Sequence, residues 1–127
     1  MIFGVGTDVV EIGRIEKALS RWGERFAERI LCEPELTRFR KHRQPASYLA
    51  KRFAAKEAFT KALGTGIKAP ANWHGLWVVN QASGKPELQF SEPLRKLLST
   101  RGVSRAHLSL ADERGIAVAT VILECAK

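Results

Sequence analysis

The chain has 127 residues, 45% hydrophobic and 27% charged, which predicts one soluble globular domain, residues 1–127, that needs no disulfide. No apolar run approaches the roughly 20 residues of a membrane span, and no basic segment precedes an apolar stretch at the amino terminus, so we expect a cytoplasmic protein without a signal peptide. The 21 Lys and Arg residues against 13 Asp and Glu give a net charge of +8, which favours an anionic partner: a nucleic acid, a nucleotide or an acidic protein.

The first third of the chain is predicted to hold a strand followed by helices. Residues 2–10 are an apolar run with strand propensity that contains one carboxylate, Asp8. Apolar residues then recur at helical spacing, and Gly23 is expected to bend or break this helix. The stripe consists of Ile15, Leu19, Trp22, Phe26 and Ile30. Pro34 would begin a short helix that ends near Lys41.

A long helix is predicted in the middle of the chain. Pro45 and Ser47 are expected to begin it, and Gly64 to end it. Alanine at every fourth position gives the helix a smooth face that permits close packing. These alanines are Ala50, Ala54, Ala58 and Ala62. Glu57 and Lys61 lie on a stripe beside this face, which places two charges near packed structure.

The second half is predicted to hold two hairpins separated by a helix. In chain order these elements are a strand at 76–79, a turn at 83–85, a strand at 88–90, a helix from Ser91 to Gly102, and strands at 106–110 and 116–123. The last strand lacks polar alternation, so we expect both its faces to be covered, and in so small a domain one cover could be another subunit. The sum is an α+β domain with a mostly antiparallel sheet packed against a long helix.

Asp8, Glu57 and Lys61 are the candidates for chemistry. A carboxylate is costly inside an apolar strand unless it is paired or binds a cation. Two carboxylates and a lysine from two elements suggest a magnesium-dependent phosphate site. Two plainer interpretations remain open at this stage. Glu57 and Lys61 could form a solvated i,i+4 pair worth about 0.2–0.5 kcal/mol, and Asp8 could cap the following helix.

Other patterns do not define a site. Gly4 and Gly6 begin a dinucleotide fingerprint that fails at Val9, and Gly64-Thr-Gly66 lies at a helix carboxyl end, where the macrodipole repels anions. Zinc is disfavoured because the thiols and imidazoles are scattered singly. They are Cys32, Cys125, His42, His74 and His107.

Basic residues follow the first helical stripe. They are Arg14, Lys17, Arg21, Arg25 and Arg29. They form either a solvated face or a docking ridge for an acidic helix. A second basic cluster at 38–43 could meet a phosphate, but it lacks the interleaved aromatic residues of single-strand nucleic-acid platforms.

Three passages resemble the holo-[acyl-carrier-protein] synthases, the small-subunit type of 4′-phosphopantetheinyl transferase. They are GVGTDVVEIGRI at 4–15, RFAAKEAFTKALGTG at 52–66, and HLSLADE at 107–113 followed by AVATVI at 117–122. The middle passage is highly specific, and the likeness covers nearly the whole chain. Many relatives end the third passage with a histidine where this chain has Asp112, so no histidine role transfers there.

The resemblance implies roles for individual residues. Asp8 and Glu57 match magnesium ligands, and Lys61 matches a lysine near the pyrophosphate of coenzyme A. The implied coenzyme A contacts are Arg52, Lys56, Lys61, Gly64, Lys85, Pro86 and, as a candidate only, His107. The implied docking residues for acyl carrier protein are Arg14, Arg21 and Arg25. The family is a homotrimer with active sites between subunits.

The implied reaction transfers 4′-phosphopantetheine from coenzyme A to a serine of apo acyl carrier protein, supporting fatty acid biosynthesis. The serine proton would go to Glu57 or to a water, and the sequence does not choose. Two other functions are weighed. A basic RNA-binding module would explain the charge, but its phosphate backbone would be repelled by Asp8 and Glu57. An inactive trimeric scaffold would bind carrier protein without transfer.

Overall fold

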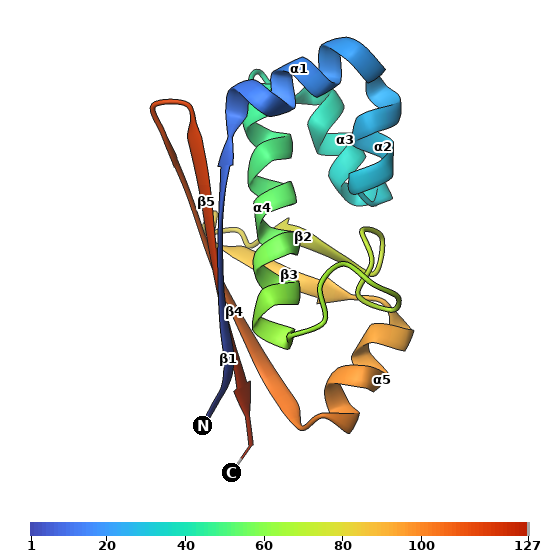
Figure 1. Cartoon of the computed structure of the whole chain (residues 1–127), viewed down its shortest axis with the longest axis vertical. Helices are drawn as coiled ribbons and strands as arrows, with labels where there is room; N and C mark the ends of the chain where they lie inside the picture. The colour runs from blue at the N-terminus through green and yellow to red at the C-terminus, as the bar shows by residue number, and fades with distance from the viewer. Residues whose placement is uncertain (127) are drawn as a thin grey trace.

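The computed structural model describes residues 1–126 (Figure 1). In chain order the elements are β1 Ile2–Glu11, α1 Ile12–Trp22, α2 Glu24–Ile30, α3 Glu33–Lys41, α4 Pro45–Leu63, β2 Leu76–Asn80, β3 Pro86–Phe90, α5 Glu92–Thr100, β4 Val103–Glu113 and β5 Ile116–Cys125. The predicted strands and helices are therefore confirmed, most of them within a few residues. The α+β fold class is confirmed as well.

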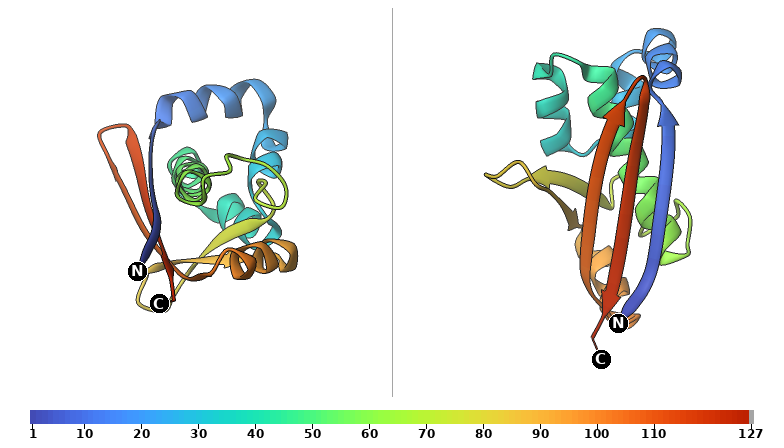
Figure 2. Two further views of the ribbon diagram at one scale, coloured as in Figure 1. Left: turned by 60° about the horizontal axis from the view of Figure 1, so that its bottom comes forward. Right: turned by 90° about the vertical axis from the view of Figure 1, so that its left-hand side faces the viewer.

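The strands form two antiparallel sheets. One has the order β1-β5-β4, and the other is the β2–β3 hairpin. Helix α4 lies along one face of the three-stranded sheet, while α1 crosses its end (Figure 1). The right-hand view of Figure 2 shows the opposite face with no described element in front of it. The fold therefore covers the larger sheet on one side.

Close backbone contact holds α4 against β1. A Cβ atom added at Gly4 or Gly6 would overlap the carbonyl oxygens of Ala62 or Ala58. Only glycine permits this approach, and the small alanine face of α4 supplies the other half of it. The Gly4-Val-Gly6 pattern thus has a packing role, and it places Asp8 beside the helix.

A buried ion pair ties α4 to the neighbouring helices and to β2. The side chains of Lys56 and Glu35 are both 0% exposed, and Lys56 Nζ lies 2.9 Å from Glu35 Oε1. Lys56 also donates to the carbonyls of Ile30 and Trp73 at 2.6 and 2.7 Å. Glu35 accepts further bonds from the backbone N–H groups of Cys32 and Val78. Because each charge has several partners, the pair is tolerated in the core.

Two apolar surfaces stay exposed within this chain. Strand β5 buries the face that contacts α4, with Ala119 and Val121 at 0% exposure, while the intervening residues are half-exposed, so cover of the second face by another subunit stays a prediction. Trp22, part of the predicted apolar stripe, is 59% exposed. The helix break at Gly23 and the end of α4 at Gly64, whose φ is 88°, are confirmed.

Among the described residues, none of the helices is long and apolar enough to cross a membrane.

Candidate active site

Asp8 lies in the middle of β1 and faces α4. Its Oδ1 atom is 3.0 Å from the Nζ atom of Lys61, and the same ammonium donates to the carbonyl of Thr7 at 2.9 Å. Asp8 is therefore not a helix cap, because it precedes α1 by several residues within a paired strand. The carboxylate and the ammonium meet because close packing of α4 brings Lys61 over this part of the strand.

Glu57 lies one turn before Lys61 on α4. Burial of its carboxyl group, and then the negative charge of Asp8, raise the pKa of Glu57, while Lys61 partly offsets this. The charge effect places the two carboxylates near each other. Within residues 1–126, the ion pair that Lys61 makes inside 4.0 Å is with Asp8 rather than Glu57. The interpretation as a simple Glu57–Lys61 pair is therefore wrong.

These donors suit a hard cation that shares its ligands with a substrate. The described part of the chain holds no cluster of three or more His, Cys, Asp or Glu that would form a complete protein cage. Mg²⁺ commonly binds through one or two carboxylates and completes its octahedron with water and phosphate oxygens. Asp8 and Glu57 fit that pattern, since they supply two carboxylates at one place and Lys61 pairs with only one of them, Asp8.

Glu57→Gln is expected to stabilise the metal-free protein at neutral pH. The pKa of Glu57 is higher in the folded protein than in the unfolded chain. At pH values between these two pKa values, the folded protein therefore binds more protons than the unfolded chain. The free energy of unfolding falls as pH rises through this interval. Glutamine cannot ionise and escapes this loss. Thermal unfolding of both proteins should show a higher Tm for the variant at about pH 7 and little difference at about pH 4. Equal Tm values at neutral pH would contradict the assigned environment.

Lys56 has no free donor for a ligand in this structure. Its ammonium is fully buried and engaged by Glu35 and two carbonyls. The ammonium is therefore held within the fold, and direct contact of Lys56 with coenzyme A stays a prediction. Sequence reasoning missed this because Glu35 is remote in the chain and gave no signal of its own.

Arg52 is also mostly enclosed, at 4% exposure. Its guanidinium stacks over Tyr48 and donates to Asn80 Oδ1 at 2.8 Å. The amide of Asn80 in turn donates to the carbonyl of Gly84 at 3.0 Å. Arg52 therefore supports the β2–β3 turn through Asn80, a link the sequence did not suggest. The turn presents Lys85 to solvent.

The remaining predicted residues are not all brought together. Gly64 follows Lys61 by less than one turn and lies near it. His107 lies on β4, on the uncovered sheet face, and pairs with Glu124. Because Asp8 faces α4 on the other side of the sheet, His107 is outside the Asp8 site of its own chain. Asp112 is engaged at the start of α4, where Ser47 Oγ donates to it at 3.0 Å.

The basic ridge is exposed along α1 and α2. A hollow of about 600 Å³ opens between aromatic and basic side chains there. Its lining residues are Arg21, Trp22, Arg25, Phe26 and Arg29. Arg21 stacks on the Trp22 ring, 4.9 Å from its centre. The exposure of Trp22 is thus part of a surface that combines positive charge with apolar contact.

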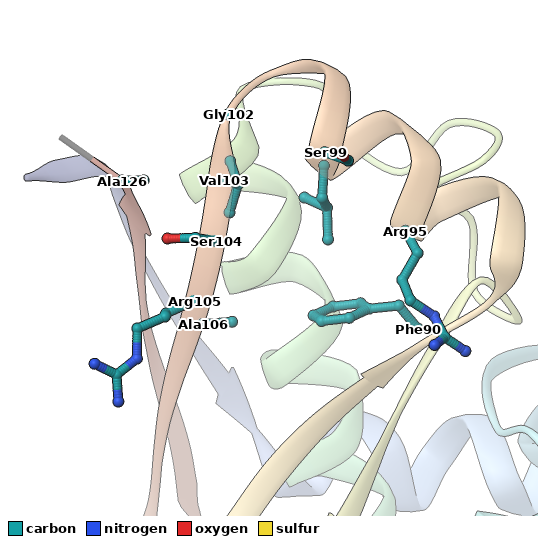
Figure 3. A pocket seen from close by; sticks show the side chains of 10 residues that line it. Phe90, Arg95, Ser99, Gly102, Val103, Ser104, Arg105, Ala106 and Ala126 are labelled. Atoms are coloured by element: carbon teal, nitrogen blue, oxygen red, sulfur yellow. The ribbon is translucent and has the colours of Figure 1, made fainter.

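A separate hollow of about 510 Å³ lies between α5, β3 and β4 (Figure 3). Phe90, Arg95 and Ala106 are among its lining residues. None of the residues predicted from the sequence to form a site lines it.

Comparison with known proteins gives the family. Residues 4–121 match the model of the 4′-phosphopantetheinyl transferase superfamily, so the chain belongs to that superfamily. It is 56% identical over 123 residues to holo-[acyl-carrier-protein] synthase of Vibrio parahaemolyticus, covering 97% of this chain and 98% of the relative. The Azoarcus enzyme is 52% identical over 124 residues, covering 98% of both chains. Within the superfamily, the chain belongs to the holo-[acyl-carrier-protein] synthases.

Solved structures agree. The crystal structure of the synthase from Neisseria meningitidis superposes with a TM-score of 0.95 at 44% identity, covering 98% of this chain and 99% of that one. The synthase from Bacillus anthracis, solved in complex with CoA (3′,5′-ADP), gives 0.84 at 38% identity, covering 99% of both. The solved synthases therefore support both the fold and the family assignment of this chain.

Proposed function

We propose that this chain, as one transferase domain spanning residues 1–127, moves 4′-phosphopantetheine from coenzyme A to a serine of apo acyl carrier protein. Adenosine 3′,5′-bisphosphate leaves, and the product serves fatty acid biosynthesis in the cytoplasm. The observation that carries this proposal is the alignment of nearly the whole chain with holo-[acyl-carrier-protein] synthases at 52–56% sequence identity. The Bacillus anthracis and Helicobacter pylori synthases, solved with coenzyme A or its nucleotide part, support coenzyme A as the donor.

The proposed metal is Mg²⁺ held by Asp8 and Glu57. When bound, it would supply positive charge to the pyrophosphate and polarise the attacked phosphorus. Such transfers depend on positioning and charge neutralisation more than on covalent help from the protein. Lys61 contributes a second cation from the same helix face, at the position where negative charge develops. The support is the contact of Asp8 with Lys61 at 3.0 Å, together with the position of Glu57 one turn before Lys61 on α4.

Coenzyme A is proposed to extend from this site toward the β2–β3 turn. Gly64 leaves open space at the end of α4, since an added Cβ would meet nothing within 4 Å. Lys85 and Pro86 would bound the nucleotide end, with the turn supported by Arg52 through Asn80. Arg52 thus acts by holding the turn, and direct contact with the ligand is not required of it.

A homotrimer is proposed because β1 and β5 leave apolar side chains exposed on the uncovered sheet face. Val5 and Val9 are 56% and 59% exposed on β1, and the half-exposed Val118 and Ile122 of β5 lie beside them. A second copy on this face would bury them. His107, on the same face, would then lie at the subunit boundary, where it could approach a neighbour's site. Light scattering should give about three times the 14.1 kDa chain mass, and a monomer would contradict the proposal.

Arg14→Glu combined with Arg21→Glu is expected to raise the KM for carrier protein by at least about tenfold, with the KM for coenzyme A unchanged. The ridge would lose its attraction for the acidic partner, and Arg25 alone would not restore it. Lys96→Glu combined with Arg95→Glu on exposed α5 is a charge-matched control. Steady-state kinetics at two salt concentrations measure both constants. An unchanged carrier-protein KM would contradict the docking role.

The transfer itself is tested by mixing the protein with apo carrier protein, coenzyme A and Mg²⁺, followed by mass spectrometry of the carrier. The expected result is a gain of one phosphopantetheine that a chelator prevents. Carrier binding without a mass gain would favour an inactive scaffold. Salt-sensitive RNA binding without turnover would favour the RNA-binding alternative.

A further inference from the structure

Lys61 already occupies one of the carboxylates assigned to the metal. Its ammonium lies 3.0 Å from Asp8 Oδ1 and 2.9 Å from the Thr7 carbonyl oxygen. The Asp8 side chain is only 16% exposed, whereas that of Lys61 is 54% exposed. Asp8 is therefore held at the strand, while the lysine reaches it from the solvent side.

This contact is incompatible with two features of the proposed function. Mg²⁺ requires oxygen ligands at about 2.0–2.1 Å in near-octahedral order, so a metal on Asp8 would lie within a few ångströms of the ammonium and repel it. The same ammonium is also needed at the pyrophosphate. Lys61 cannot neutralise Asp8 and serve the pyrophosphate at the same time.

The properties of the pair favour displacement of the lysine. The pair is open to solvent on its lysine side, where the Lys61 side chain is 54% exposed. Solvent weakens an ion pair at such a position, so a divalent ion can displace the ammonium. Lysine has a flexible four-carbon stem and can swing while its backbone stays in the helix. Asp8 has no such freedom, because β1 is paired with β5 along its length.

We infer that Lys61 is a resident cation that neutralises Asp8 in the metal-free protein and is released by the metal to become available for the pyrophosphate. The inference rests on the proposed metal site. Lys61 then has two successive partners, first Asp8 and afterwards the pyrophosphate. Metal binding would therefore assist coenzyme A binding through Lys61, in addition to any direct contact between the metal and the pyrophosphate. Metal would bind first, because without it the lysine remains on Asp8.

The direct test is a ¹H–¹⁵N spectrum of lysine ammonium groups in the wild-type protein without coenzyme A. The metal-free protein should show a protected Lys61 signal, assigned by its loss in Lys61→Arg, and Mg²⁺ should abolish or strongly shift it. Two internal references are available. Lys56 is fully buried, and Lys51 pairs with Asp112 at 3.3 Å, so both signals should stay unchanged.

Mn²⁺ binding measured by electron paramagnetic resonance, again without coenzyme A, gives a second readout. Lys61→Met should bind about two- to five-fold more tightly than wild type, because no ion pair has to be broken, and Lys51→Met should match wild type. A wild type that binds no Mn²⁺ or Mg²⁺ would reject the proposed metal site itself. Metal binding that leaves the Lys61 signal unchanged would overturn the exchange, even if Lys61→Met binds more tightly, since that would reflect simple repulsion.

Discussion

Asp8→Ala and Glu57→Ala are each expected to reduce carrier-protein modification at saturating Mg²⁺ by at least about 10³-fold, while the protein remains folded. Each variant removes one of two carboxylates, and neither the pyrophosphate nor water can replace a fixed protein ligand on that side. Mass spectrometry of the carrier protein over time measures the rate.

The folded state of these variants is checked by circular dichroism and thermal unfolding. Glu57→Ala should not be less stable than wild type, since it removes a carboxyl group whose pKa is raised by burial and by Asp8. Glu33→Gln, an exposed acid at the start of α3, serves as the matched control and should keep full activity. Wild-type rates from either alanine variant would show that the carboxylates do not hold an essential metal.

Lys56→Met is expected to lower the free energy of unfolding by about 3–5 kcal/mol. Methionine nearly fills the volume, so little of this is a cavity effect. The cost arises because the carboxylate of Glu35, which is 0% exposed, loses its counter-charge. The carbonyls of Ile30 and Trp73 would also lose a donor. Urea unfolding followed by tryptophan fluorescence measures the change.

The companion variants separate charge from packing. Adding Glu35→Gln to Lys56→Met should recover part of the loss, since no buried charge then remains unpaired. Lys51→Met, on the same helix but half-exposed, should stay within about 1 kcal/mol of wild type. A loss below about 1 kcal/mol for Lys56→Met would mean that the pair does not hold α3, α4 and β2 together.

The elements could be predicted because local signals mark their ends. Gly23 divides α1 from α2, Gly64 ends α4, and the Ser91 hydroxyl accepts the Leu94 N–H at the start of α5. Periodicity marks the α4 face in the same way, since its alanines recur at the helical repeat and the backbone at Ala58 and Ala62 lies against the β1 glycines. These features depend on residues a few positions apart, so they can be recognised without knowledge of the tertiary contacts.

The environments of Lys56, Arg52 and Trp22 could not be predicted. The burial of Lys56 depends on its partner Glu35, which is 21 positions away in the chain. No helix or strand periodicity connects residues that far apart, so the pair could not be predicted from the sequence. Arg52 was assigned to the ligand because of its neighbours in the motif, yet its partner Asn80 comes from the β2–β3 hairpin. Trp22 has the spacing of the apolar stripe, but it lies at the end of α1, beyond the part of the helix that packs against the core.

The resemblance supplied what local patterns left open. Residue types alone allowed Glu57 and Lys61 to be an ordinary surface pair, whereas the motif linked both to Asp8 across the chain. The contact between Lys61 and Asp8 agrees with that link. The Mg²⁺ ion, the docking ridge and the trimer stay predictions, and each has its measurement above.

The glycine contacts between β1 and α4 have a consequence for evolution and engineering. Since main-chain atoms touch at Gly4 and Gly6, the spacing between strand and helix has a hard lower limit that no side-chain trimming can reduce. Larger residues could only widen it, which would move Glu57 away from Asp8. Mutation at these glycines can therefore widen the gap between the two acids but cannot narrow it, and a tighter ion site would have to come from changing the acids themselves.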